Sequence, residues 1–239
     1  MAAMAGAACG GTGADQTKSD SSNVPIAEQS AAGNDSARPV GAARGRRGTV
    51  VFLGTSLTAG LGLEPEEAFP ALLQERIDSA GLPFSVVNAG LSGETSAGAL
   101  RRTDWLLRQS IDVLVIETGA NDGLRGLNVD STKANIQAII SRVLGARPSA
   151  RIALVQMEAP PNLGTGYTSR FRAMFPDLAR ENDITLLPFL LDGIAGERGL
   201  NQNDGIHPTA EGARRVTDNL WPALERELRA AAPPPTTEP

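Results

Sequence analysis

Histidine, cysteine and aromatic side chains are scarce in this 239-residue chain, which contains one His, one Cys and only 4% Phe, Trp and Tyr. A single cysteine excludes a disulfide bond within the chain and disfavours a cysteine-based metal site. One histidine and scattered carboxylates do not form a recognisable cluster of metal ligands, so we expect no metal and no cofactor. Any reaction that needs an imidazole must therefore use the single histidine, His207.

Long apolar runs and an excess of basic residues are also missing from the sequence. No run of about 18 apolar residues occurs, so the sequence predicts no membrane-spanning helix. The formal net charge is −5, whereas nucleic-acid-binding domains usually carry a basic patch. The short basic cluster Arg44-Gly45-Arg46-Arg47 is typical of a solvated linker. We therefore expect no nucleic-acid partner.

Both ends of the chain are poor in large apolar side chains. Residues 1–47 contain no Leu, Phe, Trp or Tyr, so they cannot bury enough apolar surface to offset the entropy lost on ordering. Residues 231–239 include three consecutive prolines, which is typical of a disordered tail. The sequence thus predicts a flexible N-terminal arm, one folded domain over residues 48–230 and a disordered tail.

Cys9 lies within this arm, in Gly6-Ala7-Ala8-Cys9-Gly10, followed by a stretch rich in Ser, Asn and Asp. This pattern resembles the end of a bacterial lipoprotein signal, in which the cysteine carries a lipid and the polar stretch acts as a tether. The charged and long apolar parts of such a signal are missing, so the start is truncated or the resemblance is accidental. The pattern favours an exported protein, periplasmic or tethered to a membrane through Cys9, with a cytoplasmic location as the alternative.

From residue 48 onward, short β-branched runs alternate with segments of helical periodicity, which predicts a parallel sheet covered on both faces. Runs such as Val113-Leu114-Val115-Ile116 are apolar without alternation, as expected for strands buried on both sides. We expect an α/β fold: a three-layer αβα sandwich with a five-stranded parallel sheet in flavodoxin-like order. The expected strands are residues 49–53, 84–88, 112–117, 151–157 and 184–188.

Apolar residues spaced three or four positions apart predict helices between these strands. The expected helices are one with Phe69, Leu73 and Ile77 on its inner face, one from a cap at Asp130 to Gly145, one over residues 167–182, and one that starts near Thr209 and is bent by Pro222.

Polar residues gather where the expected strands end. Gly54-Thr55-Ser56 follows the first strand, Asn88-Ala89-Gly90 follows the second, Gly119-Ala120-Asn121-Asp122 follows the third, and Asp204 and His207 follow the fifth. The carboxyl ends of parallel strands meet at one edge of a sheet, and ligands of such sheets bind there. We therefore expect these four groups to converge.

The residue types in these groups suit acyl transfer. A serine hydroxyl needs a base within hydrogen-bond reach, and His207 can serve Ser56 in that role. Asp204, three positions before His207, can accept the other ring N–H and fix the tautomer. The N–H groups of Ser56 and Gly90 and the amide of Asn121 are candidate donors to the oxyanion.

Each of these residues also has a simpler structural explanation. Ser56 or Asp204 can cap a helix, Gly90 can supply a positive φ, and Asn121 can form a local turn. Their joint placement at four strand ends favours the catalytic interpretation.

The blocks Gly54-Thr55-Ser56-Leu57, Gly90, Gly119-Ala120-Asn121-Asp122 and Asp204-Gly205-Ile206-His207-Pro208 resemble those of the SGNH (GDSL-type) hydrolases. The surrounding sequence is most similar to the bacterial arylesterase, acyl-CoA thioesterase I and lysophospholipase L1 group. The resemblance implies Ser56 as nucleophile, His207 as base, Asp204 as its partner, and Gly90 and Asn121 as oxyanion donors. The usual Asp before the serine is Thr55 here, which keeps a hydroxyl but loses a charge.

The loop after the fourth strand includes Pro161, Asn162, Leu163 and Gly164, and it resembles the acyl-contacting loop of the thioesterase I group. The resemblance implies that these residues bind the substrate. Its glycines and lack of large aromatics predict a shallow, mobile pocket. We expect a serine esterase for short- to medium-chain esters, with lysophospholipids or acyl thioesters as further substrates. The alternatives are a carbohydrate O-acetyl esterase and a non-catalytic binding protein on the same fold.

Overall fold

The computed structural model describes residues 47–232 of the chain. Residues 1–46 and 233–239 lie outside the described residues, and with them lie Cys9 and nearly all of the predicted arm and tail.

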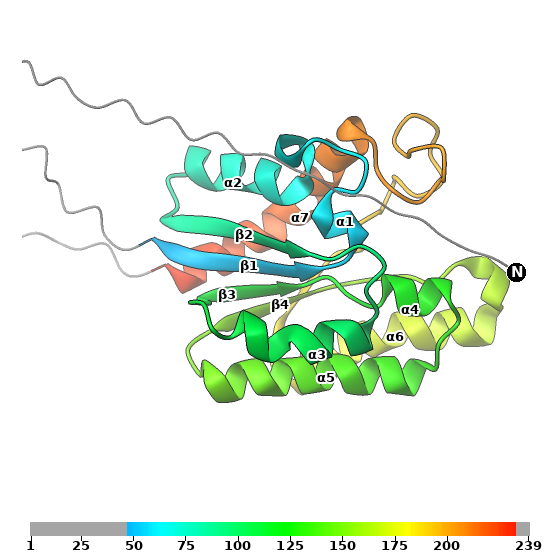
Figure 1. The fold of residues 1–239 in the computed structure, drawn as a ribbon, viewed down its shortest axis with the longest axis horizontal. Coiled ribbons are helices and arrows are strands. Elements are labelled where there is room, and N and C mark those ends of the chain that lie inside the picture. Colours follow the sequence, from blue (N-terminus) through cyan, green and yellow to red (C-terminus); the bar gives the residue numbers. More distant parts are fainter. Residues whose placement is uncertain (1–46, 233–239) are drawn as a thin grey trace, which may run out of the picture. The chain divides into compact units, whose positions relative to one another are not determined.

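Five parallel strands form the central layer, and their order β2-β1-β3-β4-β5 confirms the expected flavodoxin-like sheet. The residues of β3 are all buried, as are those of β1 from its third residue onward, because helices cover both faces of the sheet (Figure 1). The strands are β1 (Gly48–Gly54), β2 (Phe84–Gly90), β3 (Val113–Ile116), β4 (Arg151–Val155) and β5 (Thr185–Leu187).

The first two strands run further toward their carboxyl ends than the sequence predicts. Gly54 and Gly90 are partners in the parallel register, and the Leu91 N–H donates to the Gly54 carbonyl at 2.9 Å. By contrast, β3, β4 and β5 are shorter than predicted. The two strands that approach the expected site are thus paired up to their last residues.

The helices form the two outer layers of the sandwich (Figure 1). On one face lie α1 (Ser56–Ala59), α2 (Phe69–Ser79) and α7 (Ala210–Ala231). On the other lie α3 (Ser96–Leu106), α4 (Ala120–Leu124), α5 (Val129–Ala146) and α6 (Thr165–Glu181). Two short 3₁₀ turns, η1 (Pro65–Glu67) and η2 (Pro161–Leu163), complete the described elements.

Two details of the helices differ from the sequence prediction. The cap of α5 is Asn128, whose side chain accepts the Ser131 N–H at 2.9 Å, so Asp130 lies inside the first turn rather than at the cap. Helix α7 begins after the cap Thr209, as predicted, and continues to Ala231, one residue beyond the predicted end of the domain.

Helix α3 has no counterpart among the predicted helices. Its buried residues are Ser96, Ala99, Thr103 and Leu106, so small and hydroxyl side chains occupy most of its inner face. Such a face produces no apolar stripe at helical spacing, and periodicity alone does not reveal it.

Candidate active site

The four polar groups lie beyond the carboxyl ends of the strands, on the right of Figure 1. Ser56 is the first residue of α1, directly after β1 and the cap residue Thr55. Asp204 and His207 lie in the loop between β5 and α7. This arrangement brings together residues that are 151 positions apart in the sequence.

Ser56, His207 and Asp204 form a continuous chain of hydrogen bonds. The Ser56 Oγ lies 2.7 Å from His207 Nε2, and His207 Nδ1 lies 2.5 Å from Asp204 Oδ2. The second carboxylate oxygen, Asp204 Oδ1, accepts the backbone N–H groups of Ile206 at 2.9 Å and His207 at 3.0 Å. The turn between Asp204 and His207 thereby holds the carboxylate against the imidazole.

The charge of Asp204 fixes the tautomer of His207. The hydrogen bond from the His207 side chain is the main cause that lowers the pKa of Asp204 to about 2, and the two backbone N–H groups act in the same direction. An ionised carboxylate can only accept hydrogen bonds, so Nδ1 carries the proton. Nε2 is then free to accept the Ser56 hydroxyl proton.

A buried carboxylate, Glu117, organises the turn that carries Ser56. Glu117 Oε2 accepts the Thr55 N–H at 2.8 Å and the Thr58 hydroxyl at 2.8 Å, and the Thr55 hydroxyl lies 3.0 Å from both carboxylate oxygens. Ser56 is therefore held between two threonines that share one acceptor. The carboxyl group that Thr55 lacks is thus supplied by Glu117, at the end of the neighbouring strand β3.

Sequence reasoning missed Glu117, although a signal was present. The signal is a glutamate placed directly after the apolar strand β3. In the structure Glu117 is fully buried, which is rare for a glutamate without a defined partner. Burial raises the pKa of Glu117 to about 7, and the hydrogen bonds from Thr55 and Thr58 act in the opposite direction.

Gly90 lies where β2 meets α1, and a side chain there has no room. A Cβ at this position would come within 2.2 Å of the Ala59 nitrogen and 2.8 Å of the Thr58 carbonyl carbon. The Gly90 N–H donates to Asn88 Oδ1 at 2.9 Å. An acyl oxygen that binds this N–H must share it with Asn88 or displace the Asn88 side chain.

Asn121 lies in the first turn of α4, and its amide nitrogen donates to the Glu94 carbonyl at 3.0 Å. An amide nitrogen carries two N–H groups, so one remains available to a ligand. The next residue, Asp122, is buried and accepts the Ser96 N–H at 2.8 Å and the Ser96 hydroxyl at 2.6 Å. These bonds tie α4 to the start of α3.

A sequence model of the GDSL-like lipase/acylhydrolase family matches residues 52–215, a range that includes all the groups described above. The chain belongs to this family.

Two curated relatives and one solved structure are similar to this chain. Esterase TesA of Pseudomonas aeruginosa is 37% identical over 178 residues, which cover 74% of this chain and 88% of the relative. The thioesterase 1/protease 1/lysophospholipase L1 of Escherichia coli K12 is 38% identical over 178 residues, which cover 74% of this chain and 82% of the relative. A crystal structure of the psychrotrophic esterase EstA from Pseudoalteromonas sp., inhibited by monoethylphosphonate, has a TM-score of 0.71 at 36% identity and covers 76% of this chain and 98% of that chain.

In this GDSL-type hydrolase the loop after β4 lies beside the turn that follows α4. Pro161, Asn162 and Leu163 form η2, and Gly164 follows with φ of 83°. Leu163 is the nearest side chain to Gly126, since a Cβ built at Gly126 would lie 3.4 Å from Leu163 Cδ2. In residues 47–232, no hydrogen bond links this loop to Ser56 or His207.

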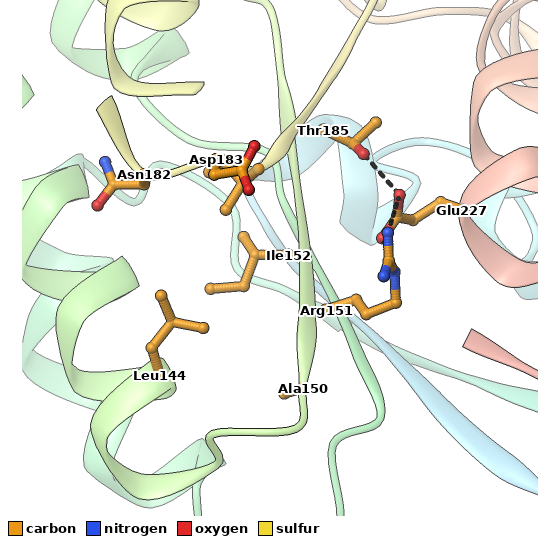
Figure 2. Close-up of a pocket in the computed structure, with 9 residues that line it drawn as sticks. Leu144, Ala150, Arg151, Ile152, Asn182, Asp183, Thr185 and Glu227 are labelled. Carbon is orange, nitrogen blue, oxygen red and sulfur yellow. Dashed lines mark hydrogen bonds and ion pairs between the residues drawn. The ribbon is translucent and has the colours of Figure 1, made fainter. Parts of the chain in front are cut away.

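A narrow hollow of about 10 Å³ adjoins Ser56 and His207 and is lined on its other sides by apolar residues that include Leu61, Leu63 and Phe69. A larger hollow of about 390 Å³ lies at the opposite, amino edge of the sheet, next to Arg151 and Glu227 (Figure 2). Among the described residues, no group of three or more His, Cys, Asp and Glu side chains is arranged to hold a metal ion, and no helix is both long and apolar enough to cross a bilayer.

Proposed function

We propose that this protein is a serine esterase that hydrolyses short- to medium-chain carboxylic esters through an acyl-enzyme on Ser56. The observation that carries the proposal is the hydrogen-bond chain from Ser56 Oγ through His207 to Asp204, at 2.7 Å and 2.5 Å. Membership in the GDSL-like family supports the same reaction class.

In the first half-reaction, Ser56 Oγ attacks the ester carbonyl carbon while His207 Nε2 takes the hydroxyl proton. The carbonyl oxygen becomes an oxyanion, for which the Ser56 N–H, the Gly90 N–H and the second Asn121 N–H are the donors. Asp204 stabilises the imidazolium formed at His207. The intermediate collapses, the bond to the alkoxy group breaks, and the imidazolium returns the proton to the departing alcohol.

In the second half-reaction, a water molecule takes the place of the serine hydroxyl. His207 accepts a proton from the water as its oxygen attacks the acyl carbon, and a second tetrahedral intermediate forms. Its collapse breaks the bond to Ser56 Oγ, which regains the proton from His207. The net result is one acid and one alcohol for each ester and water consumed.

Apolar side chains around the site support an ester with an apolar acyl group. Leu91 follows Gly90, Leu124 lies in α4 with Asn121, and Ile206 precedes His207; all three are exposed, at 52%, 45% and 37%. The hollow beside Ser56 has room for little more than one water-sized group. An acyl chain would therefore extend out of this hollow onto the open surface, where a long chain would bury little of its apolar area, and this favours short and medium chains over long ones.

A fluorophosphonate probe tests the covalent mechanism. The purified wild type should be labelled, and Ser56→Ala should not be labelled because the nucleophilic oxygen is gone. His207→Ala should lower turnover by about 10³-fold or more, with an unchanged circular dichroism spectrum. An unlabelled wild type, or a His207→Ala variant as active as the wild type, refutes the proposal, and a wild type without turnover indicates a binding protein.

A series of p-nitrophenyl esters tests the substrate range. Activity should be highest on short and medium acyl chains, with acyl thioesters and lysophospholipids included in the same panel. A maximum at palmitate or longer contradicts the proposed range. Strong activity on acetylated sugars with little on butyrate esters would instead identify a carbohydrate O-acetyl esterase.

A further inference from the structure

Arg102 of α3 reaches the carboxyl ends of two strands, β1, which precedes Ser56, and β2, which ends at Gly90. Its terminal nitrogen donates to the Ala89 carbonyl of β2 at 2.7 Å and to the Gly54 carbonyl of β1 at 3.2 Å. The Arg102 side chain is 19% exposed, so these bonds lie partly out of the solvent. One guanidinium thus joins the ends of two neighbouring strands.

The two carbonyls belong to peptides whose N–H groups matter to the site. The Ala89 carbonyl and the Gly90 N–H belong to the same planar peptide and point in opposite directions. A hydrogen bond that holds the carbonyl therefore also sets the direction of the N–H. The Gly54 carbonyl shares its peptide with the Thr55 N–H, which donates to Glu117 at 2.8 Å. This second peptide is held at both ends, immediately before the nucleophile.

Glu94 holds Arg102 and also reaches the third oxyanion group. Its carboxylate oxygens lie 2.8 Å from Arg102 Nε, and the Glu94 side chain is only 5% exposed. The backbone carbonyl of Glu94 accepts the Asn121 amide at 3.0 Å. The Arg102–Glu94 pair therefore links the peptide that carries the Gly90 N–H to the amide of Asn121.

We propose that the Arg102–Glu94 ion pair is a positioning device for the oxyanion site, which fixes the direction of the Gly90 N–H and the place of the Asn121 amide relative to Ser56. The inference rests on the proposed esterase function and deepens it. Arg102 and Glu94 act through these groups, and the guanidinium charge is balanced by the Glu94 carboxylate. Donors that are oriented before the reaction stabilise the transition state more than the bound substrate.

The structure offers a matched control at the opposite edge of the sheet. Arg151 of β4 pairs with Glu227 of α7 (Figure 2). The Glu227 side chain is 6% exposed, close to the 5% of the Glu94 side chain. This second pair joins a strand to a helix but contacts none of the groups around Ser56. Replacing either arginine disturbs the partner of a nearly buried carboxylate, whereas a loss of turnover should appear only at Arg102.

The experiment compares Arg102→Lys, Arg102→Ala and Arg151→Lys with the wild type on p-nitrophenyl butyrate. Lysine keeps the charge but cannot span Glu94 and both carbonyls with its single ammonium group. Arg102→Lys should lower kcat about tenfold or more, with KM within about threefold, because misplaced donors weaken transition-state binding. Arg151→Lys should leave kcat unchanged.

Guanidinium rescue separates positioning from general stability. Arg102→Ala should lose about 100-fold in kcat, and millimolar guanidinium chloride should restore part of it, whereas equal sodium chloride should not. A folded Arg102→Lys variant with wild-type kcat overturns the inference. The inference also fails if, in the Arg102 and Arg151 variants alike, activity falls only in proportion to the fraction of protein that is folded. If Arg102→Ala does not fold, Arg102→Lys decides the question. Fluorophosphonate labelling of the wild type shows separately whether the esterase function itself holds.

Discussion

Asp204 combines a low pKa with an unusually local partner. Its carboxylate serves the imidazole of His207, three residues away, and the backbone of the same turn. Since the pKa of Asp204 is lowered to about 2, the carboxylate stays ionised at any pH well above 2. The residue can therefore orient His207 but cannot itself supply a proton.

The first prediction concerns the exchange of Asp204 for its amide. Asp204→Asn can present an N–H to His207 Nδ1, which favours the wrong tautomer and should lower kcat by about 10²–10⁴-fold. Steady-state kinetics on p-nitrophenyl butyrate measures this loss. Asp192→Asn removes the same charge from an exposed position and should retain full activity. A kcat of Asp204→Asn within about threefold of the wild type would contradict the assigned role.

The second prediction follows from the raised pKa of Glu117. The folded protein keeps a proton on Glu117 up to pH about 7, whereas a glutamate with the ordinary pKa of 4.5 loses it earlier. Because the folded state binds more protons in this window, Glu117 contributes a loss of stability as the pH rises from about 4.5 to about 7. Relative to Glu117→Gln, the wild type should lose up to about 3 kcal/mol over that range.

Urea unfolding at several pH values measures this difference. Glu66→Gln, at an exposed position of η1, is the control and should follow the wild type at every pH. Parallel stability curves for wild type and Glu117→Gln would show that Glu117 titrates as it does in the unfolded chain. Above pH about 7, where Glu117 is ionised, Glu117→Gln should also lower kcat, since an amide cannot accept from Thr55 and Thr58 as fully as a carboxylate does.

At the scale of elements, the contact between the end of β2 and α1 sets the shape of the nucleophile turn. A Cβ at position 90 would meet the backbone of Ala59 at 2.2 Å, so backbone rather than a movable side chain occupies the space. The close approach places Gly90 beside its register partner Gly54, two residues before Ser56.

The third prediction tests this contact with Gly90→Ala. The added methyl group must separate β2 from α1, which should cost about 1–3 kcal/mol of unfolding free energy and should reduce kcat by displacing the Gly90 N–H. Gly145→Ala in α5 is the matched control, because nothing lies within 4 Å of its Cβ and alanine favours a helix. Chemical denaturation should therefore show a lower unfolding free energy for Gly90→Ala and a higher one for Gly145→Ala. Kinetics should show a lower kcat for Gly90→Ala alone. A stable, fully active Gly90→Ala variant would contradict the contact.

The fold and the meeting of the candidate catalytic residues could be predicted from the sequence because they rest on local patterns. Val113–Ile116 is recognisable as a buried strand, and Ser56, Asn121 and His207 stand out as polar residues at strand ends. The supporting groups are different. Arg102 and Glu117 act across distances in the chain of 13 and 62 residues, to Ala89 and Thr55, and no periodicity encodes which side chain reaches which backbone group. The inner face of α3 was hidden for a related reason, since it is lined with small and hydroxyl residues.

At the scale of the whole molecule, every group assigned to the reaction lies within residues 47–232. Arg47, the first of these residues, donates to the Phe84 carbonyl through its Nε at 3.1 Å and pairs with Asp78. The fourth prediction is that a chain starting at Arg47 keeps kcat within about twofold on soluble esters. A larger loss would show that residues 1–46 take part in the site or in folding.

We propose that residues 1–46 instead determine where the protein is located. In this proposal the protein is exported and carries a lipid at Cys9. The sequence Gly6-Ala7-Ala8-Cys9-Gly10 supports this proposal. Metabolic labelling with an alkyne analogue of palmitate in a bacterial host, with the protein made with a complete lipoprotein signal ahead of Cys9, should mark the wild type and not Cys9→Ser. An unlabelled wild type would refute lipidation, and Cys9→Ser should retain activity in either case.

The pairing of Ser56 with His207 across 151 residues also governs when activity can begin. The nucleophile is synthesised early and the base almost last, just before α7 completes the outer layer over the sheet. A nascent or prematurely ended chain therefore carries the serine without its base and cannot cleave esters. On the proposed mechanism, activity therefore begins only after nearly the whole domain has been synthesised.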